Sequence, residues 1–79
     1  MVRHINWIQT NSTNIDQIGY REDEQKLFIK FKSRKKEEYY LYKSVDVIKF
    51  GEFMLADSKG KFLRAEIMPK YDYEKVEEE

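Results

Sequence analysis

A strict alternation of apolar and charged side chains near the middle of the chain limits the folds that this sequence can adopt. Leu27, Ile29 and Phe31 occupy every second position, while Lys30 and Lys32 fall between them. Successive side chains of a β-strand point to opposite faces of a sheet, so this spacing is typical of a strand with one buried face. The pattern predicts a strand near residues 26–33 whose apolar side chains enter a core.

Two neighbouring segments complete the predicted sheet. Residues 15–20 and 37–43 are rich in β-branched and aromatic side chains, which suit a pleated surface. Gly19 interrupts the first segment late and indicates a bulge or a close backbone approach. Short polar connections favour pairing between consecutive strands, so we expect a three-stranded antiparallel β-meander.

A helix is expected next, from about residue 46 to 56. Ser44 or Asp46 can cap it, and Gly51 weakens it by roughly 1 kcal/mol relative to Ala. The expected sheet-facing residues follow helical spacing: Val47, Phe50, Phe53, Met54 and either Ala56 or Leu55. Gly60 ends this region, and residues 61–68 form either a short helix or a strand before Pro69. The expected fold class is therefore α+β.

The length of 79 residues supports one core only. We expect a single domain over residues 1–76 and a disordered acidic tail at 77–79. The chain has no cysteine, which excludes disulfides and thiolate metal sites and favours a cytoplasmic location. No apolar run approaches the roughly 20 residues of a membrane span, and the start of the chain has no signal-peptide pattern.

Charge is distributed unevenly although the formal net charge is zero. Residues 26–36 contain six basic side chains and no acidic one, whereas residues 72–79 contain five acids beside Lys75. Two interpretations of the acidic segment are open: a lid that competes for an anion-binding face, or a solvated chain end.

Catalysis is not expected from the residue inventory. His4 is the only histidine, and no serine lies in a Gly-x-Ser-x-Gly turn. The carboxylates occur as surface neighbours and not as an isolated pair among apolar residues, so nothing indicates a poised acid and base. The same inventory gives no metal-ligand constellation. We expect a non-enzymatic protein without cofactor or metal.

Basic and aromatic side chains supply the candidate binding residues. Tyr40 and Tyr42 share one strand face, where they either stack on unpaired bases or pack against the helix. The basic strand and turn either bind phosphate or protect a sheet edge from aggregation. Ser12, Thr13 and Asn14 either donate to an anion or form a turn. The candidate nucleic-acid contacts are Lys30, Lys32, Arg34, Lys35, Lys36, Tyr40, Tyr42, Lys59 and Lys61.

Collinear short motifs resemble the KTSC domain, a family named after the C-terminal segment of some lysyl-tRNA synthetases and also found as small stand-alone proteins. The resemblance spans roughly residues 11–76. Its pieces are Ser12-Thr13-Asn14-Ile15, Ile18-Gly19-Tyr20, Tyr40-Leu41-Tyr42, Val45, Ser58-Lys59-Gly60-Lys61-Phe62, Glu66-Ile67 and Tyr71-Asp72-Tyr73-Glu74. The sequence departs from the pattern at Asp46, where the family has a proline.

The resemblance implies a small binding module, and attachment to a synthetase suggests RNA as its ligand. We therefore expect binding of RNA or single-stranded nucleic acid. The alternative is a protein-interaction module, such as an accessory or phage-encoded factor that binds a host protein. The neutral net charge, the acidic end and the aromatic surplus favour this alternative. No membrane partner is expected, and the oligomeric state is left open.

Overall fold

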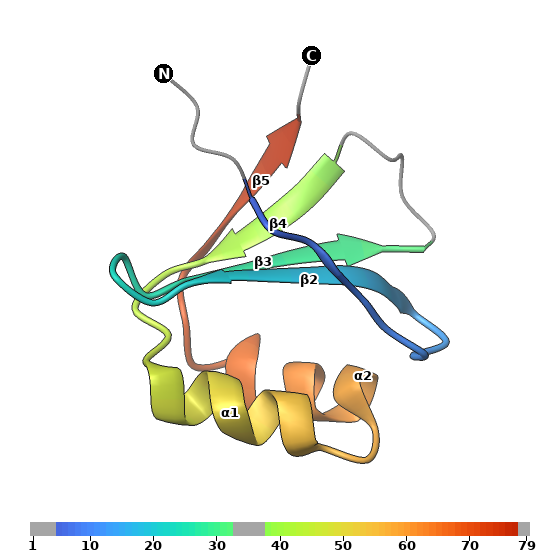
Figure 1. Cartoon of the computed structure of the whole chain (residues 1–79). Helices are drawn as coiled ribbons and strands as arrows, with labels where there is room; N and C mark the ends of the chain where they lie inside the picture. Colours follow the sequence, from blue (N-terminus) through green and yellow to red (C-terminus); the bar gives the residue numbers. More distant parts are fainter. Residues whose placement is uncertain (1–4, 33–37, 78–79) are drawn as a thin grey trace.

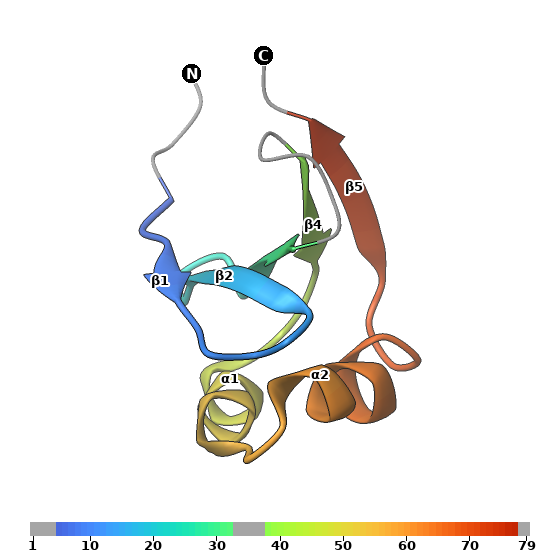
Figure 2. The same cartoon turned by 90° about the vertical axis from the view of Figure 1, so that its right-hand side faces the viewer.

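The computed structural model describes residues 5–32 and 38–77. Within these residues a five-stranded antiparallel sheet has its strands in sequence order: β1 (Ile8–Gln9), β2 (Ile15–Arg21), β3 (Lys26–Phe31), β4 (Glu38–Tyr42) and β5 (Tyr73–Glu77). Helices α1 (Val47–Leu55) and α2 (Lys59–Phe62) and the π-helix η1 (Leu63–Ile67) lie between β4 and β5 in the chain. They form a layer against one face of the sheet (Figures 1 and 2).

The three predicted strands and the main helix are confirmed, but the three-stranded count is wrong. The sequence pattern missed the two edge strands. β5 falls in the segment that we interpreted as either a lid or a solvated chain end, and it pairs with β4 over its whole length, from Tyr42↔Tyr73 to Glu38↔Glu77. Glu77, which we expected in the disordered tail, is the last residue of this strand; residues 78 and 79 lie outside the described residues.

The main core lies between the sheet and the helical layer. As predicted, Leu27 and Ile29 are fully buried there, while Phe31, Phe50 and Met54 are partly buried and pack against the same cluster. The buried members of this cluster come from β2, β3, β4, the segment before α1, α1 itself and η1: Ile15, Ile18, Leu27, Ile29, Tyr42, Val45, Phe53, Leu63 and Ile67.

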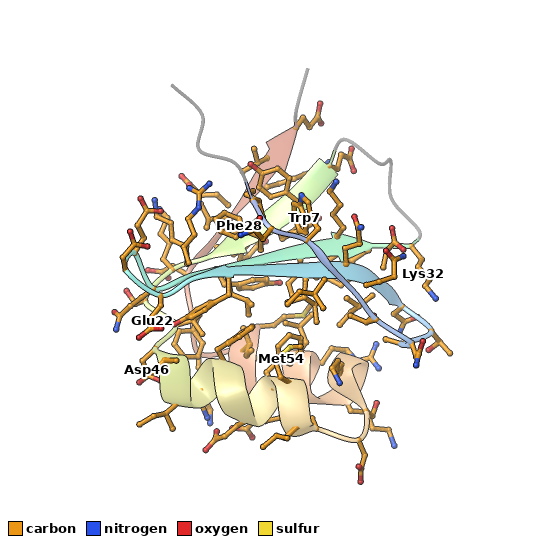
Figure 3. The ribbon with its side chains drawn as sticks, viewed as in Figure 1. Trp7, Glu22, Phe28, Lys32, Asp46 and Met54 are labelled. Atoms are coloured by element: carbon orange, nitrogen blue, oxygen red, sulfur yellow. The ribbon has the colours of Figure 1, made fainter. Side chains whose placement is uncertain are left out.

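A second cluster covers part of the opposite face of the sheet. Ile5, Phe28, Tyr39 and Leu41 are buried there, and Trp7 packs against them. The Trp7 ring meets Phe28 and Tyr39 edge-on, with centroids 6.3 and 5.5 Å away. Figure 3 shows Trp7 and Phe28 on one side of the sheet and Met54 on the other. The middle of β3, from Leu27 to Ile29, is therefore buried on both faces, while Lys26, Lys30 and Phe31 are partly exposed.

Helix α1 begins as expected, with Asp46 as its cap. The Asp46 carboxylate accepts a hydrogen bond from the Lys49 backbone N–H at 2.8 Å. The expected inward face needs one correction, because Val47 and Leu55 point to solvent; Leu55 is 86% exposed.

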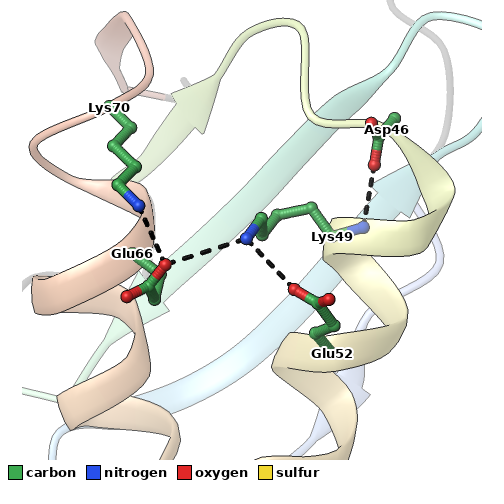
Figure 4. Close-up of polar contacts among 5 residues, drawn as sticks. All are labelled: Asp46, Lys49, Glu52, Glu66 and Lys70. Atoms are coloured by element: carbon green, nitrogen blue, oxygen red, sulfur yellow. Dashed lines mark hydrogen bonds and ion pairs between the residues drawn. The ribbon is translucent and has the colours of Figure 1, made fainter.

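An ion pair joins α1 to η1. The Lys49 ammonium pairs with Glu66 of η1 at 3.8 Å and also with Glu52 of its own helix at 3.0 Å (Figure 4).

The sequence left residues 61–68 open between helix and strand; residues 61–67 are helical, and Met68 lies in the turn that follows. Ser58 caps this region by accepting from the Lys61 N–H at 3.4 Å. The helix then widens to i→i+5 bonding, with Met68 N–H bonded to the Leu63 carbonyl at 2.8 Å. In the part of the chain described here, no helix is both long enough and apolar enough to cross a membrane.

Candidate functional site

An open cleft of about 590 Å³ separates the loop between β1 and β2 from the start of α2. In Figures 1 and 2 this loop and α2 lie at the same end of the molecule. Polar side chains supply most of the lining, which comprises Gln9, Thr10, Asn11, Ser12, Thr13, Asn14, Met54, Asp57, Ser58, Lys59, Gly60, Lys61 and Arg64.

Hydroxyl groups hold one wall of the cleft in shape. The Thr10 hydroxyl donates to the Ile15 carbonyl at 2.7 Å. The Ser12 hydroxyl accepts from the backbone N–H groups of Asn14 and Ile15, both at 3.2 Å. Such side-chain bonds to nearby backbone are the usual way in which Ser and Thr stabilise a turn. Of the two interpretations of Ser12, anion binding and turn formation, its contacts therefore fit turn formation.

The opposite wall carries positive charge. Lys59, Lys61 and Arg64 surround the cleft, against one carboxylate from Asp57. Within residues 5–32 and 38–77, these three basic side chains have no ion-pair partner, whereas the basic side chain of Lys49 is engaged by two glutamates. An unpaired cation retains its full attraction for an incoming anion, so the cleft favours anionic ligands.

Gly60 lies beside the wall formed by the β1–β2 loop. A Cβ built at this position would lie 3.6 Å from the Asn14 amide nitrogen and 3.9 Å from the Ser12 hydroxyl oxygen. These are ordinary van der Waals separations, so Gly60 contributes open space to the cleft and is not required by a steric clash. The Asn14 side-chain amide makes no hydrogen bond within the described residues.

A smaller hollow of about 230 Å³ adjoins the cleft. Asn14, Gly60 and Arg64 line both spaces. The remaining lining residues are Ile15, Phe31, Leu63 and Met68. Ile15 and Leu63 are buried, so Phe31 and Met68 supply the accessible apolar surface. Arg64 is therefore placed where it can serve both an anionic group in the cleft and an apolar group in the hollow.

Aromatic rings continue from this hollow across the sheet. The Phe31 ring contacts Tyr40 edge-on at 5.4 Å, and Tyr40 contacts Tyr73 at 5.7 Å. These three residues come from β3, β4 and β5, which are neighbours in the sheet. Tyr73 is exposed, while Phe31 and Tyr40 are partly exposed. The row links the hollow to the exposed edge at β5.

The structure does not gather the sequence-predicted binding residues into one place. Lys59 and Lys61 line the cleft. Lys30 lies on the opposite face of the sheet, with its ammonium 4.5 Å from the centre of the Trp7 ring. Lys32 is exposed just after β3, and its backbone N–H bonds to the Asn14 carbonyl at 2.9 Å. Arg34, Lys35 and Lys36 lie outside the described residues.

The two tyrosines of the predicted stacking face differ in access. Tyr42 is only 2% exposed, and burial, followed by the nearby Tyr40 and Tyr73, raises the pKa of its phenol to about 12. A ring held in the core presents no face to a base, so the stacking role is withdrawn for Tyr42. Tyr40 faces the same side but keeps part of its surface exposed.

Sequence reasoning missed Arg64, Phe31 and Met68 as site residues. Arg64 follows Gly60 by four positions, which places both on one side of a helix. This spacing could not be used from the sequence alone, because the sequence did not decide whether residues 61–68 form a helix or a strand. Phe31 was assigned to the core by its alternation with Lys30, although its position at the end of β3 leaves it beside the hollow.

Comparisons with known proteins agree with these features. The family model described as the KTSC domain matches residues 11–73, which include all of the cleft lining except Gln9 and Thr10. The crystal structure of a KTSC domain protein from Yersinia pestis is similar to this chain with a TM-score of 0.83 and 30% sequence identity, covering 92% of this chain and 99% of that one. No curated protein matches the sequence. This chain belongs to the KTSC domain family.

Proposed function

We propose that this domain is a non-enzymatic module that binds single-stranded RNA or DNA, with phosphate groups in the cleft between the β1–β2 loop and α2. The observation that supports the proposal is a set of three cations, Lys59, Lys61 and Arg64, which line one wall of the cleft and have no ion-pair partner among the described residues. Lysine, arginine and small polar side chains make most protein contacts to nucleic-acid phosphates. The facing wall supplies such polar groups at Thr13 and Asn14.

The concave shape favours a single strand over a duplex. Duplex DNA is commonly read by a helix or ribbon that projects into a groove, whereas single strands are held in positively charged grooves that follow the backbone. No histidine or cysteine lines the described cleft. The hydroxyls of Thr10, Ser12 and Ser58 bond to backbone groups. These contacts support a binding role for the cleft residues.

Salt dependence tests the electrostatic part of the proposal. Each phosphate contact to a single strand contributes about 0.7 to the slope of log affinity against log salt, so three contacts give a slope of about 2. Raising salt from about 50 to about 200 mM should then weaken binding about 20-fold. Fluorescence anisotropy with labelled oligonucleotides measures this. Lys61→Ala and Arg64→Ala should each lower the slope by about 0.7.

Lys43→Ala is the matched control for these variants. Lys43 follows β4 at the opposite end of the sheet and forms an exposed ion pair with Glu74 at 3.5 Å. Its removal changes the net charge by the same amount without touching the cleft. The proposal is contradicted if no oligonucleotide binds at about 50 mM salt, where phosphate contacts are strongest. It is equally contradicted if Lys43→Ala flattens the slope as much as Lys61→Ala does.

The other basic residues predicted from the sequence are further candidate phosphate contacts, but the proposal does not depend on them. Lys32 is tied to the cleft wall through its backbone bond to Asn14, so a strand that leaves the cleft beside this loop can reach its side chain. Contacts from Arg34, Lys35 and Lys36 to phosphate stay predictions. Lys30 is the weakest of the set, because its ammonium lies over Trp7 on the other face of the sheet.

A protein-interaction module is the second candidate, and an exposed apolar stripe on α1 favours it. Ile48 is 72% exposed and Leu55 is 86% exposed, and the two are seven positions apart on one side of the helix. Gly51 lies between them, with nothing within 4 Å of a Cβ built there. Pull-down from lysate with and without nuclease separates the candidates. Partners that survive nuclease but are lost with Ile48→Gln support protein binding.

A further inference from the structure

We infer that the 230 Å³ hollow beside the cleft is a pocket for one unpaired nucleobase of the bound strand. The inference rests on the proposed function, because the phosphate of the same nucleotide is assigned to the cleft. Asn14, Gly60 and Arg64 line both spaces, so the hollow opens directly onto the cationic wall. A nucleotide has the same division into an anionic part and a flat, largely apolar ring.

The lining suits a base in its chemistry. Phe31 presents an aromatic ring, and Met68, which is 39% exposed, presents a polarisable side chain that adapts to flat surfaces. Arg64 adds a planar guanidinium that binds phosphate and also stacks on rings. The hollow is smaller than the roughly 300–1,000 Å³ of pockets for drug-sized ligands, so it accepts a single ring system.

Polar recognition of the base edge falls to Asn14. Its side-chain amide offers both donors and an acceptor, and none of them is used within the described residues. Asparagine commonly pairs with base edges through this combination of groups. The amide therefore gives the pocket a preference among bases, beyond the stacking that every base provides.

The row of aromatic rings from Phe31, Tyr40 and Tyr73 offers the bound nucleic-acid strand a path away from the pocket. Tyr40 lies 5.4 Å from Phe31, and Tyr73 lies a further 5.7 Å along, on the exposed strand β5. A following base can lie over Tyr73, which is exposed, while its phosphate faces solvent. This path requires bases that are free of partners, because paired bases cannot turn their faces to these rings.

An abasic strand of matched length tests the pocket, because it keeps every phosphate and lacks every base. We expect the full-length protein to bind a base-bearing strand about 5- to 150-fold more tightly than the abasic strand, which is the range for one stacked base. Met68→Gln and Phe31→Leu should remove most of this difference. Both variants should leave the abasic affinity and the salt slope unchanged. Leu55→Gln is the matched apolar-to-polar control on α1.

The outcomes separate the pocket from the proposed function. Equal affinity for the two strands, with the expected salt slope, overturns the base pocket and leaves phosphate binding in the cleft intact. Absence of binding to either strand overturns both. Loss of affinity for both strands in Met68→Gln also overturns the pocket, because a base contact cannot affect an abasic ligand. Should Phe31→Leu not fold, Met68→Gln, which alters an exposed side chain, decides the result.

Discussion

Alkaline titration of Tyr42 tests whether the Tyr-x-Tyr segment belongs to the core. The phenol is 2% exposed and its pKa is raised from 10.0 to about 12, mainly by burial and then by Tyr40 and Tyr73. This difference of 2 pKa units corresponds to about 2.7 kcal/mol, since one unit is worth about 1.36 kcal/mol. The protein should lose about this much stability when the environment forces the phenol to ionise.

The sign follows from proton binding in the two states. Between pH 10 and about 12, the unfolded chain has released the Tyr42 proton while the folded chain still holds it. The unfolded state then binds fewer protons, so the free energy of unfolding falls as pH rises. The contribution is fully present below pH 10 and is lost by about pH 12.

Urea titrations between about pH 9 and 12 measure this loss. Tyr42→Phe keeps the ring and removes the titrating group, so its free energy of unfolding should fall less over the same range, by roughly 2 to 3 kcal/mol. Lysine deprotonation affects both proteins equally and cancels in the comparison. Parallel curves for wild type and Tyr42→Phe would refute the reasoning and return Tyr42 to the list of possible surface rings.

Three further predictions concern stability and use urea denaturation. Gly51→Ala should stabilise the protein by about 0.5 to 1 kcal/mol, because Gly51 lies inside α1 and a Cβ there meets nothing within 4 Å. Gly19→Ala should destabilise it by roughly 1 to 3 kcal/mol, because its Cβ would lie 2.5 Å from a methyl carbon of Ile5. Phe53→Ala should cost roughly 3 to 5 kcal/mol, since Phe53 is fully buried. A cost below about 1 kcal/mol for Phe53→Ala would contradict the assigned inward face of α1.

Side-chain alternation was sufficient to predict β3 but not the layer that covers its other face. Leu27, Ile29 and Phe31 identify one buried face, and this part is confirmed. Phe28 lies on the opposite face, where Lys30 indicated solvent. The rings that bury it come from Trp7 and Tyr39, which are distant in sequence. Contacts of this kind depend on the tertiary fold and leave no local periodicity.

The edge strand β5 escaped prediction for a different reason. Its sequence, Tyr-Glu-Lys-Val-Glu, is mostly charged. Only Val76, which packs against the cluster around Phe28, and Tyr73, whose ring contacts Tyr40 and Tyr42, add apolar contacts. Pairing with β4 uses backbone groups, which every residue carries, so it is invisible in the side-chain pattern. The Lys75 ammonium also pairs with the buried Glu38 carboxylate at 3.4 Å. The charge of Lys75 therefore pairs with a carboxylate of the neighbouring strand, and it does not indicate a solvated tail.

The candidate site was predictable only where one local motif contained it. Lys59 and Lys61 were chosen from the sequence, and both line the cleft. The alternation of side chains along a strand correctly placed Tyr40 and Tyr42 on a common face, but it does not show whether other parts of the protein cover that face. The answer depends on where the helical layer ends: it buries Tyr42 and leaves part of Tyr40 uncovered.

The residues that carried the resemblance to the family in the sequence divide into those whose role the fold explains and those whose role it does not. Gly19 leaves room for Ile5, and the Tyr20 hydroxyl donates to the Val45 carbonyl at 2.5 Å. Ser12 and Ser58 shape the two cleft walls through backbone bonds. Each of these residues has a structural role that requires no ligand.

The side chains of Asn14, Lys59 and Lys61 have no comparable role. Within the described residues none of them forms a side-chain hydrogen bond or ion pair. All three line the same cleft, although they come from segments more than 40 positions apart in the sequence. Polar groups that make no side-chain bond within the described residues and line one cleft are available to the anionic ligand proposed above. The same argument sets the order of experiments: Lys59 and Lys61 come first, since their loss should weaken binding without unfolding the protein.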